Sequence, residues 1–232
     1  MRNLRRFWVT GATNGLGLAL VQGLLEQGCH VATSGKPCRE LDDLEAHHPG
    51  QLLRLPAPLH DAAQAHLAAA RLQAEWGTLD GLIVNAGSCD YLPQAQASDE
   101  LFEAIVTSNL LASEHCLAGA LPLLVKGDAP QVMAIFSPCT TLQLHDPAQP
   151  PSGVNNLPQW FREQRQTLHA LGIDLAMVAP QSLTTPVTPA RAIPEQWTPY
   201  RAAQALLQRL PQREPELVLE ALSLNSLWPL PH

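Results

Sequence analysis

Paired cysteines, long apolar runs and a strong basic balance are all missing from this 232-residue sequence. Its five cysteines are odd in number and show no paired-ligand spacing, which argues against a disulfide framework and a zinc site. No apolar segment is long enough to span a bilayer, and the first residues lack the apolar core of a signal peptide. We therefore expect a cytoplasmic protein with no membrane partner and no bound metal.

Basic residues are also too few for a nucleic-acid-binding surface. The 14 Lys and Arg residues are outnumbered by 21 Asp and Glu residues, so the net charge is −7. Binding to nucleic acid needs clustered Lys and Arg. The length suits one α/β domain with a sizeable core. We predict a single dinucleotide-binding domain over residues 1–232 and no nucleic-acid partner.

Three glycines follow the first apolar run, Phe7-Trp8-Val9, and open onto apolar residues at helical spacing. Gly11 allows a tight turn, Gly15 leaves room for a pyrophosphate beside the backbone, and Gly17 lets the helix pack closely on a sheet. The N–H groups of the first helical turn then face the anion. A glycine turn that merely connects strand and helix gives the same pattern. The phosphate-binding interpretation predicts contacts from Gly11, Thr13, Asn14, Gly15, Leu16 and Gly17.

The spacing of Thr10, Gly11, Gly15 and Gly17 resembles the Thr-Gly-x-x-x-Gly-x-Gly motif of the short-chain dehydrogenase/reductase family. A second segment, Leu82-Ile83-Val84-Asn85-Ala86-Gly87, resembles the strand of that family that ends in Asn-Ala-Gly. The resemblance implies an α/β fold with one doubly wound, Rossmann-type parallel sheet and helices on both faces. It also implies that Asn85, Ala86 and Gly87 line the floor of a cofactor site. Family members form dimers or tetramers, so a homo-oligomer is expected through the helix that contains Leu101 to Leu124.

The residues after the second expected strand, His30–Gly35, bear on cofactor choice. An NAD site usually has an acidic residue here for the ribose 2′-hydroxyl, whereas a 2′-phosphate needs a cation. This chain offers Ser34 and Lys36 and has no acid before Glu40. We predict NADP(H) over NAD(H), with Ser34 and Lys36 as contacts, although Lys36 as a plain exposed loop charge is an open alternative. The resemblance adds Thr185, which matches a Thr that binds the nicotinamide carboxamide.

Apolar periodicity, turn residues and the resemblance predict the remaining elements. The expected strands are Gln51–Leu55, Leu79–Gly87, Gln131–Ser137, Asp174–Pro180 and Leu217–Leu222. The expected helices are Gly15 onward, Ala62–Trp76, Ser98 or Asp99 to Leu124, one from near Pro158 to Gly172, and Tyr200–Leu210.

Two further residues match catalytic positions of the family. Ser137, at the end of the fifth expected strand, matches the serine that orients the substrate carbonyl. Asn109 matches the helix Asn that helps to hold a proton-relay water. For Ser137, a simple turn role is the alternative.

The family's proton donor is missing. The reaction of the family uses Tyr-x-x-x-Lys, which places both side chains on one helical face. The only tyrosines are Tyr91 and Tyr200, and the only lysines are Lys36 and Lys126. None of them lies in the interval after Ser137 where the pair belongs, which ends before Gly172. Counting back from Gly172-Ile173 puts the Tyr position near Pro150 and the Lys position near Val154.

The stretch Pro150-Pro151-Ser152-Gly153-Val154 also opposes a regular helix, because proline lacks an N–H donor and glycine adds backbone freedom. The turn that would present the acid is therefore expected to be a loop. His145 is a candidate substitute donor, since histidine titrates near neutrality.

Three functions follow from these patterns. The first is an NADP(H)-binding protein with a degenerate site, acting as a non-catalytic subunit, regulator or cofactor sensor. The second is an NADP(H)-dependent oxidoreductase that acts on a carbonyl or alcohol with a non-standard proton donor. The third is an assembly partner of an active relative that has lost cofactor binding. The missing pair puts the non-catalytic interpretation first.

Overall fold

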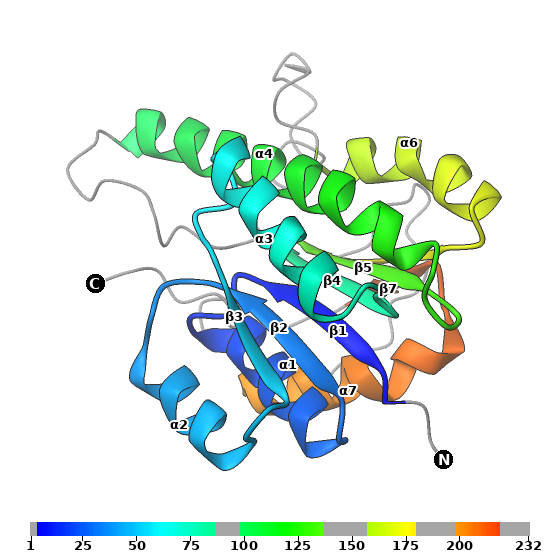
Figure 1. Cartoon of the computed structure of the whole chain (residues 1–232). Helices are drawn as coiled ribbons and strands as arrows, with labels where there is room; N and C mark the ends of the chain where they lie inside the picture. The colour runs from blue at the N-terminus through cyan, green and yellow to red at the C-terminus, as the bar shows by residue number, and fades with distance from the viewer. Residues whose placement is uncertain (1–3, 87–97, 137–156, 180–197, 219–232) are drawn as a thin grey trace.

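The computed structural model describes residues 4–86, 98–136, 157–179 and 198–218 of the chain. Strands and helices alternate along these residues (Figure 1). The strands are β1 (Arg6–Thr10), β2 (His30–Ser34), β3 (Leu52–Leu55), β4 (Gly81–Ala86), β5 (Gln131–Phe136), β6 (Asp174–Ala179) and β7 (Glu216–Val218). The helices are α1 (Gly15–Glu26), α2 (Arg39–His47), α3 (Ala62–Glu75), α4 (Ser98–Leu124), α6 (Leu157–Ala170), α7 (Pro199–Arg209) and the short 3₁₀ turn η2 (Leu210–Gln212).

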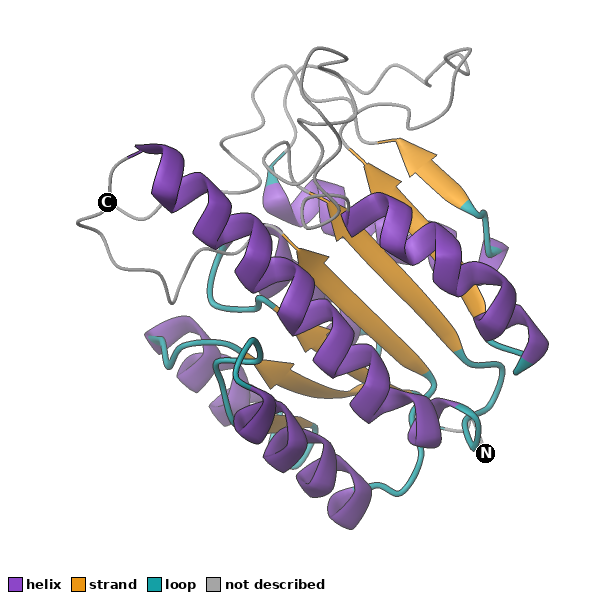
Figure 2. Ribbon diagram, turned by 90° about the horizontal axis from the view of Figure 1, so that it is seen from above, coloured by secondary structure: helices purple, strands orange, loops and turns teal. Residues whose placement is uncertain are grey.

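The strands form one parallel sheet in the order β3-β2-β1-β4-β5-β6-β7. All the described strand pairs are parallel, and the arrowheads in Figure 2 point the same way. The order turns back at β1, which pairs with β2 on one side and with β4 on the other. In an open parallel sheet, such a switch point leaves a crevice at the carboxyl ends of the strands, where ligands bind. The predicted doubly wound sheet is confirmed.

Two layers of helices cover the sheet. Helices α1, α2 and α7 lie on one face, and α3, α4 and α6 lie on the other (Figure 1). The strands are apolar on both sides, as expected for a parallel sheet that is covered on both faces. In β1, Trp8 contributes to the core beneath α3, α4 and α6, whereas Phe7 and Val9 pack toward α1 and α7.

Helix boundaries follow local chemistry. The Asp61 carboxylate accepts hydrogen bonds from the N–H groups of Ala63 at 2.8 Å and Gln64 at 3.3 Å, so it caps α3. The Thr198 hydroxyl accepts from the N–H of Arg201 at 3.2 Å, and Pro199 fills the first turn of α7. Gly28 follows α1 with φ of +78°, the left-handed geometry of a helix C-terminus.

Some expected boundaries were wrong. Helix α2 was not predicted, because it is nine residues long and Leu41 is its one buried residue. Helix α6 buries Phe161 and Leu168 but ends at Ala170, before the expected Gly172, and Leu171 is 42% exposed beyond its end. The last strand begins at Glu216, one residue before the expected start. Within the described ranges, α4 and the other helices are too short or too polar to cross a bilayer.

Candidate functional site

The glycine turn lies between β1 and α1, at the switch point of the sheet. Gly11 and Gly15 have φ of +61° and +53°, the left-handed region that side chains rarely adopt. Glycine at these two positions therefore relieves backbone strain, as the tight turn requires. The turn leads directly into α1, so it places the first N–H groups of this helix at the carboxyl edge of the sheet.

Gly17 brings α1 against this turn. A Cβ atom built on Gly17 would lie 2.0 Å from the carbonyl oxygen of Gly11 and 2.8 Å from Nδ2 of Asn85. The Asn85 Nδ2 group donates a hydrogen bond to that same Gly11 oxygen at 3.1 Å. The Asn85 backbone N–H donates to the hydroxyl of Thr10 at 3.2 Å. Asn85 thus fastens the end of β4 to the end of β1 and to the turn, and it is only 6% exposed.

The first turn of α1 is suited to an anion. Asn14 occupies the N-cap in extended conformation, and its side chain makes no capping hydrogen bond. The first turn also carries no acidic residue. Its N–H groups and the positive end of the helix dipole attract a phosphate. The Leu16 side chain is fully buried in the core. It therefore supports the turn, and the backbone of Leu16 forms part of that turn.

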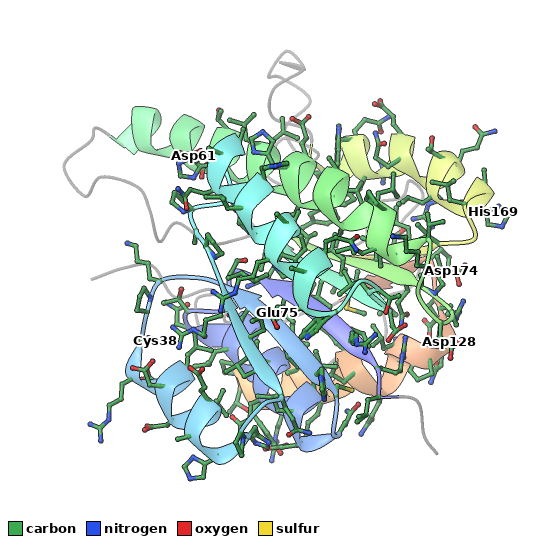
Figure 3. All side chains as sticks on the ribbon, in the orientation of Figure 1. Cys38, Asp61, Glu75, Asp128, His169 and Asp174 are labelled. Atoms are coloured by element: carbon green, nitrogen blue, oxygen red, sulfur yellow. The ribbon has the colours of Figure 1, made fainter. Side chains whose placement is uncertain are left out.

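The segment after β2 is fastened to the glycine turn. The Lys36 backbone N–H donates to the Thr13 hydroxyl at 3.0 Å, and the Cys38 thiol donates to the Thr13 carbonyl oxygen at 3.4 Å. Lys36 is exposed. In Figure 3, Cys38 and Asp61, which follow β2 and β3, lie on the left side of the molecule, where the strands end. The backbone of Lys36 is therefore held beside the glycine turn.

Ser34 does not share this position. Its hydroxyl is buried, at 2% exposure of the residue, and accepts a hydrogen bond from the indole N–H of Trp8 at 3.0 Å. The alternation of side chains along β2 turns Ser34 into the core beside Trp8. This geometry argues against the expected contact between Ser34 and a nucleotide, and it gives Ser34 a role inside the sheet.

Asn109 lies on α4 and is 6% exposed, with its carbonyl oxygen accepting from the Ser113 hydroxyl at 2.7 Å. The preceding residue, Ser108, hydrogen-bonds His60 across 3.2 Å. The segment after β3 is therefore attached to α4 next to Asn109. This places Asn109 on the same side of the sheet as that segment.

Several predicted site residues lie outside the described residues. They are Gly87, Ser137, His145, Thr185 and the positions near Pro150 and Val154. Ala86 is described as the last residue of β4, so its backbone ends at the carboxyl edge of the sheet.

Other candidate sites are weaker. No group of three His, Cys, Asp or Glu side chains within the described ranges is arranged to hold a metal ion. Cys29 and Cys116 are buried, and burial raises the pKa of both thiols, so neither is suited to act as a nucleophile.

A groove of about 540 Å³ lies at the opposite, amino-terminal edge of the sheet, lined in part by Arg165, Arg213 and His169. Arg165 donates to the carbonyl oxygens of Leu175 and Pro215 at 3.2 and 3.0 Å, so its guanidinium is already hydrogen-bonded to the backbone. In Figure 3, His169 and Asp174 lie on the right side, away from Cys38. We assign no site to this groove.

Sequence reasoning missed the contacts that Thr13 makes. They join residues 23 and 25 positions apart, and both depend on how β2 lies beside β1. The one sequence signal is that a hydroxyl stands two residues after Gly11, inside the turn.

Comparison with known proteins agrees with this geometry. The short chain dehydrogenase family model matches residues 6–195. A cis-2,3-dihydrobiphenyl-2,3-diol dehydrogenase of Paraburkholderia xenovorans (strain LB400) is 32% identical over 123 residues, which cover 50% of this chain and 44% of that protein. An oxidoreductase of Sarocladium schorii is 25% identical over 211 residues, covering 89% and 82% of the two chains. This chain thus spans less than half the length of the first relative.

The fold also matches a solved structure. The NADPH-bound carbonyl reductase from chicken fatty liver has a TM-score of 0.68 and 23% identity, with 89% of this chain and 91% of that chain covered. That likeness supports the fold. The extent of the family match, together with the parallel sheet and its glycine turn, settles the classification: the chain belongs to the short-chain dehydrogenase family.

Proposed function

We propose that this chain binds NADP(H) at the turn between β1 and α1 and acts as an oxidoreductase on a carbonyl or alcohol. The observation that carries the proposal is the intact cradle: Asn85 holds Gly11, Gly17 leaves no room for a side chain, and the first turn of α1 has no acid or side-chain cap in the described residues. A dinucleotide pyrophosphate fits such a turn. Relatives named dehydrogenase and oxidoreductase support turnover over the non-catalytic interpretation that the sequence placed first.

The nucleotide, when bound, would supply or accept a hydride. The backbone N–H groups of the turn would hold its pyrophosphate and nearby ribose; these are the groups of Gly11, Thr13, Asn14, Gly15, Leu16 and Gly17. Lys36 is proposed to pair with a 2′-phosphate, which gives the preference for NADP(H). Asn85 would support the floor of the site with Ala86 and Gly87.

The proton chemistry is assigned from the sequence. Ser137 is proposed to hydrogen-bond the substrate oxygen, and Asn109 to hold a water for proton transfer. Thr185 is proposed to bind the nicotinamide amide. No Tyr or Lys occurs between residues 138 and 172, so this is a divergent member whose proton comes from His145 or from water. Loss of a general acid typically lowers the rate by about 10² to 10⁴.

Titration of the purified chain with NADPH and with NADH tests the cofactor step. We expect NADPH to bind more tightly, and Gly15→Asp to abolish binding by placing a carboxylate at the phosphate. Slow NADPH oxidation with a panel of carbonyl compounds, or NADP⁺ reduction with cyclic cis-diols, would then support turnover. Loss of that turnover in Ser137→Ala would support the serine's role, whereas an unchanged rate would overturn it.

The second candidate is a nucleotide-binding protein without turnover, such as a cofactor sensor or regulatory subunit. The missing Tyr-x-x-x-Lys pair favours it. Tight NADPH binding with no turnover on any substrate of the panel would support it over the oxidoreductase. Absence of binding to both nucleotides would contradict both candidates and leave an assembly role with an active relative.

A further inference from the structure

Thr13 links two segments that meet at the nucleotide site. Its hydroxyl accepts from the Lys36 N–H at 3.0 Å, and its carbonyl oxygen accepts from the Cys38 thiol at 3.4 Å. A Cβ atom on Gly35 would lie 2.8 Å from the Thr13 hydroxyl oxygen and 3.2 Å from the Thr13 nitrogen. Residues 35, 36 and 38 therefore all lie against Thr13. The position of the segment between β2 and α2 depends on the position of the glycine turn.

The link bears on the direction in which Lys36 extends. Between Ser34 and Arg39 the chain has no helix or strand of its own, so few backbone hydrogen bonds fix it. The other cations of this region face carboxylates of α2: Arg54 lies 3.0 Å from Asp42, and Arg39 lies 3.9 Å from Asp43. Lys36 is the cation whose backbone is held to the phosphate-binding turn itself.

Gly35 adds a second constraint. An acidic side chain at this position would suit a ribose 2′-hydroxyl, but its Cβ would press on Thr13. Space for an acidic side chain at position 35 is therefore incompatible with the position of Thr13 that accepts the bond from Lys36. The Thr13 hydroxyl that accepts from the Lys36 N–H also crowds any side chain at position 35, including the acidic one that favours NAD(H).

We infer that Thr13 is a positioning residue for nucleotide selectivity: through the Lys36 backbone it holds the ammonium group where the 2′-phosphate of NADP(H) binds. The inference rests on the proposed NADP(H) site. Thr13 acts on the 2′-phosphate through Lys36, so its loss should weaken ligands that carry this phosphate and spare those that lack it.

Calorimetric titration with 2′,5′-ADP and with 5′-ADP tests this inference, because the two probes differ only in the 2′-phosphate and need no turnover. The variants are Thr13→Val, which keeps the shape and removes the hydroxyl, Thr13→Ser, which keeps the hydroxyl, Lys36→Ala, and the Thr13→Val/Lys36→Ala double variant. We expect Thr13→Val to raise the Kd of 2′,5′-ADP about fivefold, as for loss of one hydrogen bond, and that of 5′-ADP less than twofold. Thr13→Ser should restore the wild-type ratio. The double variant should be no less selective than Lys36→Ala alone, because two changes that act through one group are not additive.

Equal weakening of both probes in Thr13→Val, or additive losses in the double variant, would overturn the role of Thr13 while leaving the nucleotide site intact. Wild-type protein that binds neither probe would overturn the proposed function and this inference with it. A thermal melt of each variant separates a local effect from unfolding, since Thr13→Ser and Thr13→Val should melt within a few degrees of each other.

Discussion

Replacement of Gly17 by alanine tests whether the close approach of α1 to the glycine turn is needed for stability and for nucleotide binding. The added Cβ would stand 2.0 Å from the Gly11 carbonyl oxygen, where ordinary contacts begin at 3.4 Å. That oxygen is backbone and is already bonded to Asn85, so α1 or the turn must move by more than 1 Å. Overpacking of this kind costs about 1–3 kcal/mol, offset by a helix-propensity gain of about 1 kcal/mol. We expect a net loss near 2 kcal/mol, which is the upper end of the overpacking cost less the helix-propensity gain, because the Gly11 oxygen belongs to the backbone and cannot turn aside.

Gly23→Ala is the matched control. Gly23 lies on the same helix, and its added Cβ meets only the flexible Cδ1 of Leu207 at 2.7 Å. Urea unfolding at constant slope gives both free energies. We expect Gly23→Ala to remain within about 1 kcal/mol of wild type and to keep its NADPH affinity, whereas Gly17→Ala should raise the Kd for NADPH at least tenfold. Equal stability and equal affinity in the two variants would refute the argument that Gly17 closes the cradle.

Three further predictions concern the rest of the fold. Asp61→Ala should destabilise the protein by about 1 kcal/mol through loss of the α3 cap, and Asp61→Asn should recover most of it in urea unfolding; equal effects would contradict a capping role. Asp80→Ala should lower stability by about 3 kcal/mol in the same assay, because the Asp80 carboxylate accepts from the backbone N–H groups of Arg6 at 2.8 Å and Asp128 at 2.7 Å, and both would lose their partner. Burial raises the pKa of the Cys116 thiol, so the folded state keeps a proton that the unfolded state releases above about pH 8.5. Stability should therefore fall by up to about 1.4 kcal/mol per pH unit above that value, and Cys116→Ala should show a shallower fall in unfolding measured from pH 8 to 10. Identical slopes would contradict it.

The sheet could be predicted because its signals are local. Each buried strand is a short apolar run with a turn residue after it, and Gly11, Gly15 and Gly17 mark a turn whose geometry needs glycine. Asp61 and Thr198 mark the starts of α3 and α7, because each side chain caps the helix that follows it. These features depend on neighbours within a few residues, so sequence reasoning reaches them.

The parts that were missed depend on contacts between distant segments. Helix α2 is nine residues long and contributes one fully buried residue, Leu41, so its apolar signal is short. Ser34 and Lys36 are two positions apart and look equivalent in the sequence, yet Ser34 ends β2 and its hydroxyl accepts from Trp8, whereas Lys36 lies beyond the strand and is exposed. The link from Thr13 to Lys36 exists only once β2 lies beside β1.

The residues around the turn differ in how much the fold depends on them, and this difference has an evolutionary consequence. Asn85 and Gly17 hold the turn in the fold and shape the proposed phosphate site with the same atoms, so substitution at these positions should remove both properties together. Lys36 is exposed and lies outside both apolar cores. Its side chain can change with little loss of stability. Proteins that keep this fold can therefore change their preference between NADP(H) and NAD(H) through residue 36 without losing the fold.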